Sequence, residues 1–149
     1  MTHWTEHYLK AKYRDGARGE FEDGAYWYDC WAVAREARHV HLGKRLLPSW
    51  AHVRNTMPRL FTRAYKAEAA SMDECKPEPG AIAAVFRGSL MVHVGVVLEL
   101  DGRLCVLEIN PKSGARIRSV KDFEAPYLRV IYYRDRDEAD ANRDLPIQD

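Results

Sequence analysis

The segment 90–110, LMVHVGVVLELDGRLCVLEIN, constrains the fold of this chain more than any other feature of the sequence. In it, two runs of apolar and β-branched residues stand on either side of Asp101 and Gly102. An Asp-Gly pair between two such runs is a strong signal for a β-hairpin. The sequence therefore predicts a hairpin that pairs the strand carrying His93 with the strand carrying Glu108.

Shorter β-type runs occur on both sides of this hairpin, and helix-type runs precede all of them. The β-type runs are AIAAVF, ARIRSV and YLRVIYY, punctuated by Gly, Asp or Pro, and they predict an antiparallel sheet. Helices followed by strands are typical of the α+β class. We therefore expect an α+β fold with N-terminal helices packed on a C-terminal antiparallel β-sheet.

Three helical segments are expected before the strands. The first is short and carries Trp4, Tyr8 and Lys12 on one stripe, and the second begins at or just before Cys30. Pro58 marks a break or a new first turn in the third. The expected helices cover residues 4–12, 30–40 and 49–70, and residues 14–24 are expected to form a loop.

The length and the C-terminal composition predict one domain followed by a tail. A chain of 149 residues can bury a substantial core, and this one has no internal repeat. Its last segment, RDRDEADANRDLPIQD, has mixed charges and no aromatic residue, so it cannot bury enough apolar area to order itself. We expect one domain over residues 1–134 and a polar, flexible tail over residues 135–149.

Charge and hydropathy exclude several classes of partner. The sequence has 23 Lys and Arg against 22 Asp and Glu, a net charge of +1, which gives no electrostatic case for a nucleic-acid binder. No basic segment followed by an apolar one opens the chain, and no apolar run approaches the roughly 20 residues that span a bilayer. These patterns predict no membrane insertion, no signal peptide, and synthesis and folding in the cytoplasm.

The cysteine pattern argues against a disulfide framework and against a zinc site. Cys30, Cys75 and Cys105 form no CxxC motif and cannot all pair within one chain. We expect Cys75 in a connector and Cys105 in a strand. No set of residues has the spacing of a metal site, so we predict neither a metal nor a cofactor.

Cys30 stands where a turn is expected to give way to a helix, in DGAYWYDCWAVAREA. Unpaired N–H groups at a helix N-terminus favour the thiolate and make a cysteine there a nucleophile near neutral pH. Asp29 is expected to cap the helix, although its charge would oppose a thiolate if it pointed inward. For an isolated cysteine the commoner explanation is a small buried hydrophobe.

His93 lies in the most apolar run of the chain. Alternation places Val92 and Val94 on one face of the strand and His93 and Gly95 on the other, and Gly95 would leave open space above the sheet. A buried imidazole needs a partner, and a backbone carbonyl of the core is the commoner one.

Across the predicted hairpin, Glu108 and Asn110 share one strand face and either side chain could hold the His93 ring. With Cys30 included, a nucleophile, a base and an orienting group are all available. At this point the residues leave open which of the two polar side chains orients the ring.

The motifs Asp-Cys-Trp at 29–31 and His-Val-Gly at 93–95 occur in one chain, together with PEPGAIAAVF, LEINPKSGARIRSV and a closing LRVIYYR. Over residues 3–134 this pattern resembles the NlpC/P60 cysteine peptidases, especially their bacteriophage tail-associated branch. The resemblance implies a papain-like α+β fold and cleavage of peptidoglycan stem peptides next to D-glutamate.

Carried over by this resemblance, Cys30 is the nucleophile and His93 the base. The third residue of the family is His, Asn or Gln, and the best-matching position here is Glu108, with Asn110 two residues further on. A carboxylate can hold an imidazolium, but the departure is also compatible with another substrate or with lost catalysis.

The resemblance also implies partners for this chain. We assign substrate contacts to Tyr26 and Trp31, and to Arg116, because stem-peptide carboxylates need cationic partners. The expected partners are a peptidoglycan stem peptide and phage tail proteins, with association to the virion. The alternatives are an inactive structural tail component and an amidase or acyltransferase on the same fold.

Overall fold

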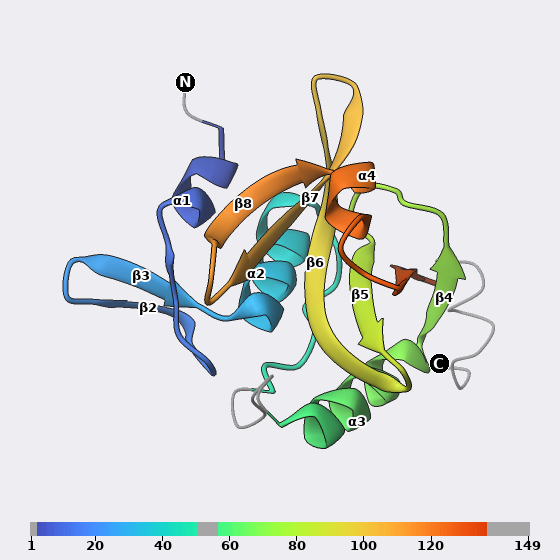
Figure 1. The fold of residues 1–149 in the computed structure, drawn as a ribbon. Coiled ribbons are helices and arrows are strands. Elements are labelled where there is room, and N and C mark those ends of the chain that lie inside the picture. The colour runs from blue at the N-terminus through green and yellow to red at the C-terminus, as the bar shows by residue number, and fades with distance from the viewer. Residues whose placement is uncertain (1–2, 51–56, 137–149) are drawn as a thin grey trace, which may run out of the picture.

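The computed structural model describes residues 3–50 and 57–136 and shows an α+β fold (Figure 1). Its main sheet has six strands in the order β4-β9-β5-β6-β7-β8, and every neighbouring pair is antiparallel. The predicted α+β class and antiparallel sheet are thereby confirmed.

The helical elements are α1 (Thr5–Leu9), α2 (Cys30–Glu36), the π-helical turn η1 (Ala37–His41), α3 (Pro58–Ala69) and α4 (Val120–Glu124). The strands are β1 (Lys12–Tyr13), β2 (Arg18–Glu22), β3 (Ala25–Tyr28), β4 (Met72–Cys75), β5 (Ile82–Arg87), β6 (Leu90–Leu100), β7 (Arg103–Asn110), β8 (Gly114–Ser119) and β9 (Arg129–Asp135).

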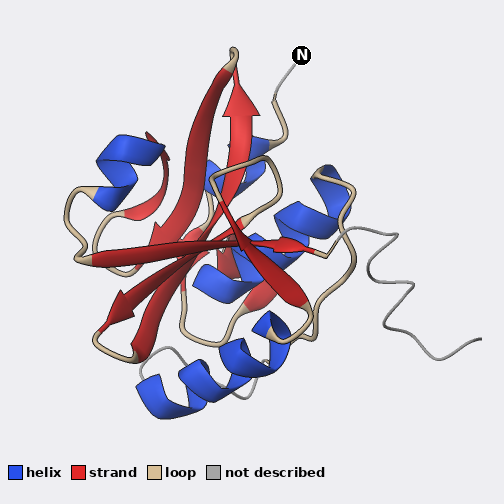
Figure 2. Ribbon diagram, turned by 90° about the vertical axis from the view of Figure 1, so that its right-hand side faces the viewer, coloured by secondary structure: helices blue, strands red, loops and turns tan. Residues whose placement is uncertain are grey.

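Both faces of the six-stranded sheet are covered, because alternate residues of its strands enter two different apolar clusters. On β5, Ile82 and Ala84 belong to the cluster that contains residues of α2 and α3, whereas Ala83 and Val85 belong to the cluster around Phe123 of α4. Figure 2 shows the twisted strands crossing in the centre with helices around them. The larger core therefore lies between the sheet and α2 and α3.

The hairpin predicted at Asp101 and Gly102 is present. Both residues have positive φ angles, 51° and 77°, as a two-residue turn between twisted strands requires. β6 and β7 pair from Leu100 opposite Arg103 to Val96 opposite Leu107. The strand of His93 is thus the neighbour of the strand of Glu108.

The expected loop over residues 14–24 is wrong in its second half. β2 and β3 form a hairpin there, with Asp23 and Gly24 at φ angles of 51° and 77°, and β1 pairs with β3 in parallel. This turn has the same Asp-Gly sequence as the one at 101–102. The hairpin is not predicted, because β2 is charged and largely exposed and so lacks an apolar face.

The helix boundaries also differ from those expected. α1 ends at Leu9, so that Lys12 belongs to β1, and α3 begins at Pro58, which is its new first turn. Ser49 and Trp50 are not helical, and residues 51–56 lie outside the described residues. Two short elements were not expected at all: β4, which contains Cys75, and α4.

A bulge near the start of β6 changes the face on which one residue lies. Val85 is opposite His93, whereas Phe86 is opposite Met91, so Val92 is an extra residue on β6. Val92 packs against the cluster around α4, not with Val94 as strict alternation would require.

The last described strand includes part of the expected tail. Asp135 ends β9 and forms an ion pair with the buried Arg38 at 2.7 Å. The expectation for residues 137–149 lies outside the described residues. Within the described part of the chain, no helix is both long enough and apolar enough to cross a membrane.

Candidate active site

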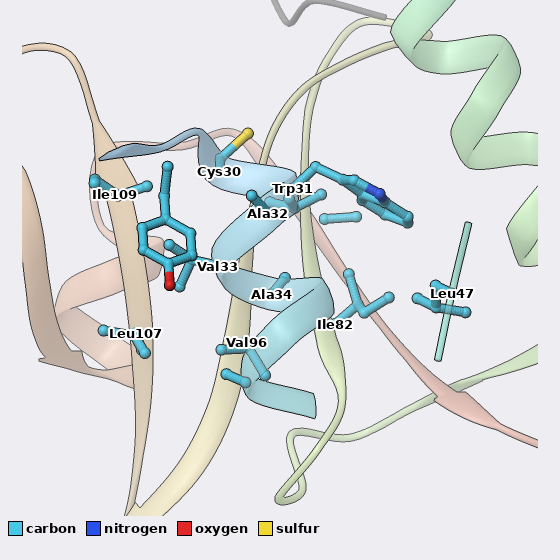
Figure 3. Close-up of a cluster of buried hydrophobic side chains, with 14 of the residues drawn as sticks. Cys30, Trp31, Ala32, Val33, Ala34, Leu47, Ile82, Val96, Leu107 and Ile109 are labelled. Atoms are coloured by element: carbon cyan, nitrogen blue, oxygen red, sulfur yellow. The ribbon is translucent and has the colours of Figure 1, made fainter. Parts of the chain in front are cut away.

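Cys30 is the first residue of α2 (Figure 3). Asp29 is the N-cap of this helix. The Asp29 carboxylate accepts hydrogen bonds from the backbone N–H of Ala32 and of Gly16, both at 2.9 Å, and its oxygen lies 2.7 Å from a nitrogen of Arg18. The predicted capping role of Asp29 is confirmed. Its charge is held by these three donors, which fix the start of the helix.

The surroundings of the Cys30 thiol favour its neutral form. The side chain is only 2% exposed, and this burial raises the pKa of Cys30 above its ordinary value, with a further contribution from the Asp29 carboxylate. The amides of Val94 and Trp31 act in the opposite direction but do not outweigh burial. Of the two explanations that the sequence leaves open for Cys30, burial fits this environment and a stabilised thiolate does not.

A small pocket reaches Cys30 from the side of α3. Trp31, predicted to contact substrate, is buried and forms part of its wall, where the indole N–H donates to the carbonyl of Pro48. Tyr26, the second predicted contact, lies elsewhere: it is 42% exposed and lines a separate groove with residues of α1. The pocket lining is Arg18, Asp29, Cys30, Trp31, Trp50, Phe61, Ala64 and Tyr65.

His93 and Glu108 form the central pair of the site. Nε2 of His93 lies 2.7 Å from Oε1 of Glu108, across the gap between β6 and β7, and both residues are buried. This pairing occupies one ring nitrogen and leaves Nδ1 for another partner. The partner of the buried imidazole is therefore a carboxylate and not a backbone carbonyl of the core.

β6 and β7 separate at this site, which brings Cys30 to the strand of His93. Their pairing ends at Val96 and Leu107, and the next residues of β7 pair only with β8. The backbone N–H of Val94, on β6, acts to lower the pKa of Cys30, so the start of α2 lies beside that strand. Cys30 belongs to the cluster of α2, whereas the His93 ring lies near Phe123 of α4, which belongs to the other cluster.

Glu108 has a second cationic partner. Nε of Arg116, on β8, lies 3.1 Å from Oε2 of Glu108. Burial alone would raise the pKa of Glu108, but the hydrogen bond and charge of His93, followed by those of Arg116, outweigh burial and hold this pKa below its ordinary value of 4.5. The carboxylate is therefore ionised at neutral pH.

Asn110, the alternative orienting residue, is engaged in a turn. Its side-chain oxygen accepts hydrogen bonds from the backbone N–H groups of Lys112 and Ser113 at 3.0 and 2.9 Å, and from the Ser113 hydroxyl at 3.0 Å. This is an Asx-type turn between β7 and β8. The position next to the imidazole thus belongs to Glu108.

Two aromatic residues that the sequence does not predict for this site lie against the imidazole. The rings of Phe123 and Tyr127 have centroids 6.4 and 6.5 Å from that of His93. Burial, followed by the charge of the Glu108 carboxylate, raises the pKa of Tyr127. The sequence carries one signal for α4, because serine is a preferred N-cap residue. The Ser119 hydroxyl accepts a hydrogen bond from the backbone N–H of Asp122.

The open space expected over Gly95 is absent. A Cβ atom there would come within 2.6 Å of Cγ1 of Val106 and within 3.5 Å of Cε1 of Phe123. The prediction of a groove at this glycine is therefore wrong. Gly95 lets β7 and α4 pack closely against β6.

Among the described residues, no three His, Cys, Asp or Glu side chains are grouped in a way that could hold a metal ion. In comparisons with known proteins, no family model, no curated protein and no solved structure matches the chain. The function is therefore inferred from the chemistry of Cys30, His93 and Glu108 and from the motifs that contain them.

Proposed function

We propose that this chain is a cysteine hydrolase in which Cys30 is the nucleophile, His93 the base and Glu108 the group that orients His93. The observation that carries the proposal is the 2.7 Å contact between Nε2 of His93 and Glu108. It leaves Nδ1 as the ring nitrogen to which the proposal assigns the proton exchange with Cys30, since the amide of the next residue, Val94, acts on the pKa of Cys30.

The chemistry follows from this arrangement. Nδ1 of His93 takes the proton of the Cys30 thiol, and the thiolate attacks the carbonyl carbon of an amide to give a tetrahedral adduct. The C–N bond then breaks, the amine leaves with the proton from His93, and a thioester remains on Cys30 until water, deprotonated by His93, hydrolyses it. Glu108 stabilises the imidazolium formed in each step.

The oxyanion of the adduct needs hydrogen-bond donors. The backbone N–H of Cys30 is at the first position of α2, where no carbonyl of the same helix can accept from it. We assign it to the oxyanion, with the partial positive charge of the helix start in support.

For the substrate we propose an amide in the peptide part of peptidoglycan, next to D-glutamate. The support is the resemblance of Asp-Cys-Trp at 29–31 and His-Val-Gly at 93–95 to the NlpC/P60 pattern. The α+β fold, with Cys30 at the start of a helix and an antiparallel sheet, is compatible with that pattern. Delivery as part of a phage tail belongs to the same proposal.

A second candidate, a structural tail component without catalysis, is favoured by one observation. The Cys30 thiol is 2% exposed, and burial raises its pKa. A cysteine that serves only to fill the core would have this environment.

Defined muropeptides, incubated with the full chain and examined by mass spectrometry, separate the two candidates. The hydrolase produces two fragments whose masses sum to that of the substrate plus water, and Cys30→Ala produces none. Glu108→Gln should slow the reaction, whereas Asn110→Ala, the matched control on the same strand, should change it little. Cleavage by the Cys30→Ala protein would exclude Cys30 as the nucleophile, and an inactive wild type would favour the structural candidate.

A further inference from the structure

We propose that Arg116 is a positioning residue of this site, which holds Glu108 ionised and in place against His93; the proposal rests on the function proposed above. Arg116 lies directly opposite Glu108 in the pairing of β7 with β8. From there its Nε reaches Oε2 at 3.1 Å, while Oε1 faces Nε2 of His93 at 2.7 Å.

The two partners hold different oxygens of the same carboxylate. A rotation of the Glu108 carboxylate that would misalign the hydrogen bond to His93 also breaks the one to Arg116. Since Glu108 orients the imidazole, Arg116 limits the rotation of the imidazole by fixing the Glu108 carboxylate. Arg116 thus acts through Glu108 and does not itself contact the proposed reacting atoms.

The charge of Arg116 is needed when His93 is neutral. Glu108 is 1% exposed, and a buried carboxylate without a cationic partner takes up a proton. His93 supplies a positive charge only when it is protonated, yet the base must be neutral before it accepts the proton of Cys30. A guanidinium is charged throughout the pH range in which proteins fold, so Arg116 keeps Glu108 ionised in that resting state.

This role differs from the substrate contact that the sequence predicted for Arg116. A residue that binds only a substrate carboxylate changes KM, whereas a positioning residue changes kcat and its pH dependence. Arg118 is the matched control, because it is two residues further along β8 and, among the described residues, forms no ion pair with a carboxylate.

The test is a titration of the Glu108 side-chain carboxyl by ¹³C NMR, in the full chain labelled at glutamate and with the signal assigned from Glu108→Gln. Arg116→Gln should move the Glu108 titration to higher pH, Arg116→Lys should move it less, and Arg118→Gln should leave it in place. If Arg116→Gln fails to fold, Arg116→Lys carries the test alone, since a single ammonium replaces the fork of the guanidinium. An unchanged Glu108 titration in the Arg116 variants would overturn the proposal.

Kinetics on muropeptides give the second readout. In Arg116→Gln, kcat should fall progressively as the pH is lowered while KM stays as in the wild type, and Arg116→Lys should restore part of the loss. A raised KM with an unchanged pH profile would make Arg116 a substrate contact instead. The titration needs no substrate, so it decides whether Arg116 controls Glu108 even if the wild type cleaves nothing, an outcome that counts against the proposed function alone.

Discussion

At the scale of the residue, the thiol of Cys30 is the side chain on which the proposed chemistry depends most. Cys30→Ala should abolish hydrolysis, because no thioester can form, and it should lower the free energy of unfolding by about 1 kcal/mol, because it removes one buried sulfur. Turnover and urea denaturation measure the two effects. Cys105→Ala, at a partly exposed position of β7, is the control and should alter neither; residual hydrolysis in Cys30→Ala would contradict the assignment.

The ionisation of Glu108 predicts a pH dependence of stability. Its pKa is lowered in the folded protein, so its contribution is present above the ordinary value of 4.5 and is lost as the pH falls through the lower folded value. The free energy of unfolding should therefore decrease less steeply below pH 4.5 in Glu108→Gln than in the wild type. Glu99→Gln, at an exposed position of β6, is the control, and parallel curves for wild type and Glu108→Gln would refute the prediction.

Sequence could predict that Glu108 or Asn110 faces His93, and that an isolated cysteine is usually buried, but not which residues bury Cys30. The pair follows from one local turn, because Asp101 and Gly102 fix which strands are neighbours. The burial of Cys30 depends on Trp50 and on residues of α3, which are brought over it by the tertiary fold. No local pattern around residue 30 shows which residues cover it.

At the scale of the element, the cap of α2 should contribute more than an ordinary helix cap. Asp29→Ala removes the acceptor of two backbone N–H groups and leaves the nearly buried Arg18 without its carboxylate, so we expect a loss of about 2 kcal/mol or more. Ser119→Ala, which removes the cap of the exposed start of α4, should cost about 1 kcal/mol. Thermal denaturation compares the two variants, and equal losses would show that Asp29 acts only as a cap.

Which elements could be predicted depended on whether they carry an apolar face. The long strands β6 and β7 bury residues along most of their length and were found. β2 and β4 are short and half exposed, and α4 has five residues, so their patterns resemble those of loops. The bulge at Val92 could not be found, because it depends on the pairing with β5.

At the scale of the whole molecule, an ion pair joins the helical half of the chain to its last strand. Arg38 of η1 is fully buried and lies 2.7 Å from Asp135 at the end of β9. Asp135→Asn would leave a buried guanidinium without its counter-charge, a change that typically costs about 3–5 kcal/mol. Asp73→Asn, which removes the more exposed ion pair with Arg136, should cost less than about 1 kcal/mol. Urea denaturation measures both, and a small effect of Asp135→Asn would show that Arg38 finds other partners.

The α+β class of the whole molecule could be predicted, because helix-type runs precede strand-type runs in the sequence. The surroundings of Cys30 could not, because Arg18, Phe61 and Tyr65, which line its pocket, come from distant parts of the chain. The same applies to Arg38 and Asp135, which are far apart in the sequence.

The most direct test of whether Cys30 and His93 act together is the alkylation of Cys30 by iodoacetamide in the native protein. Peptide mapping gives the rate at Cys30, which is divided by the rate at Cys105. The proposed function requires that Cys30, although buried in this structure, is alkylated near neutral pH, and that His93→Gln slows this reaction while the rate at Cys105 stays the same. If Cys30 is unreactive in the folded wild type, or equally reactive in His93→Gln, then the thiol is part of the core and the chain is no cysteine hydrolase.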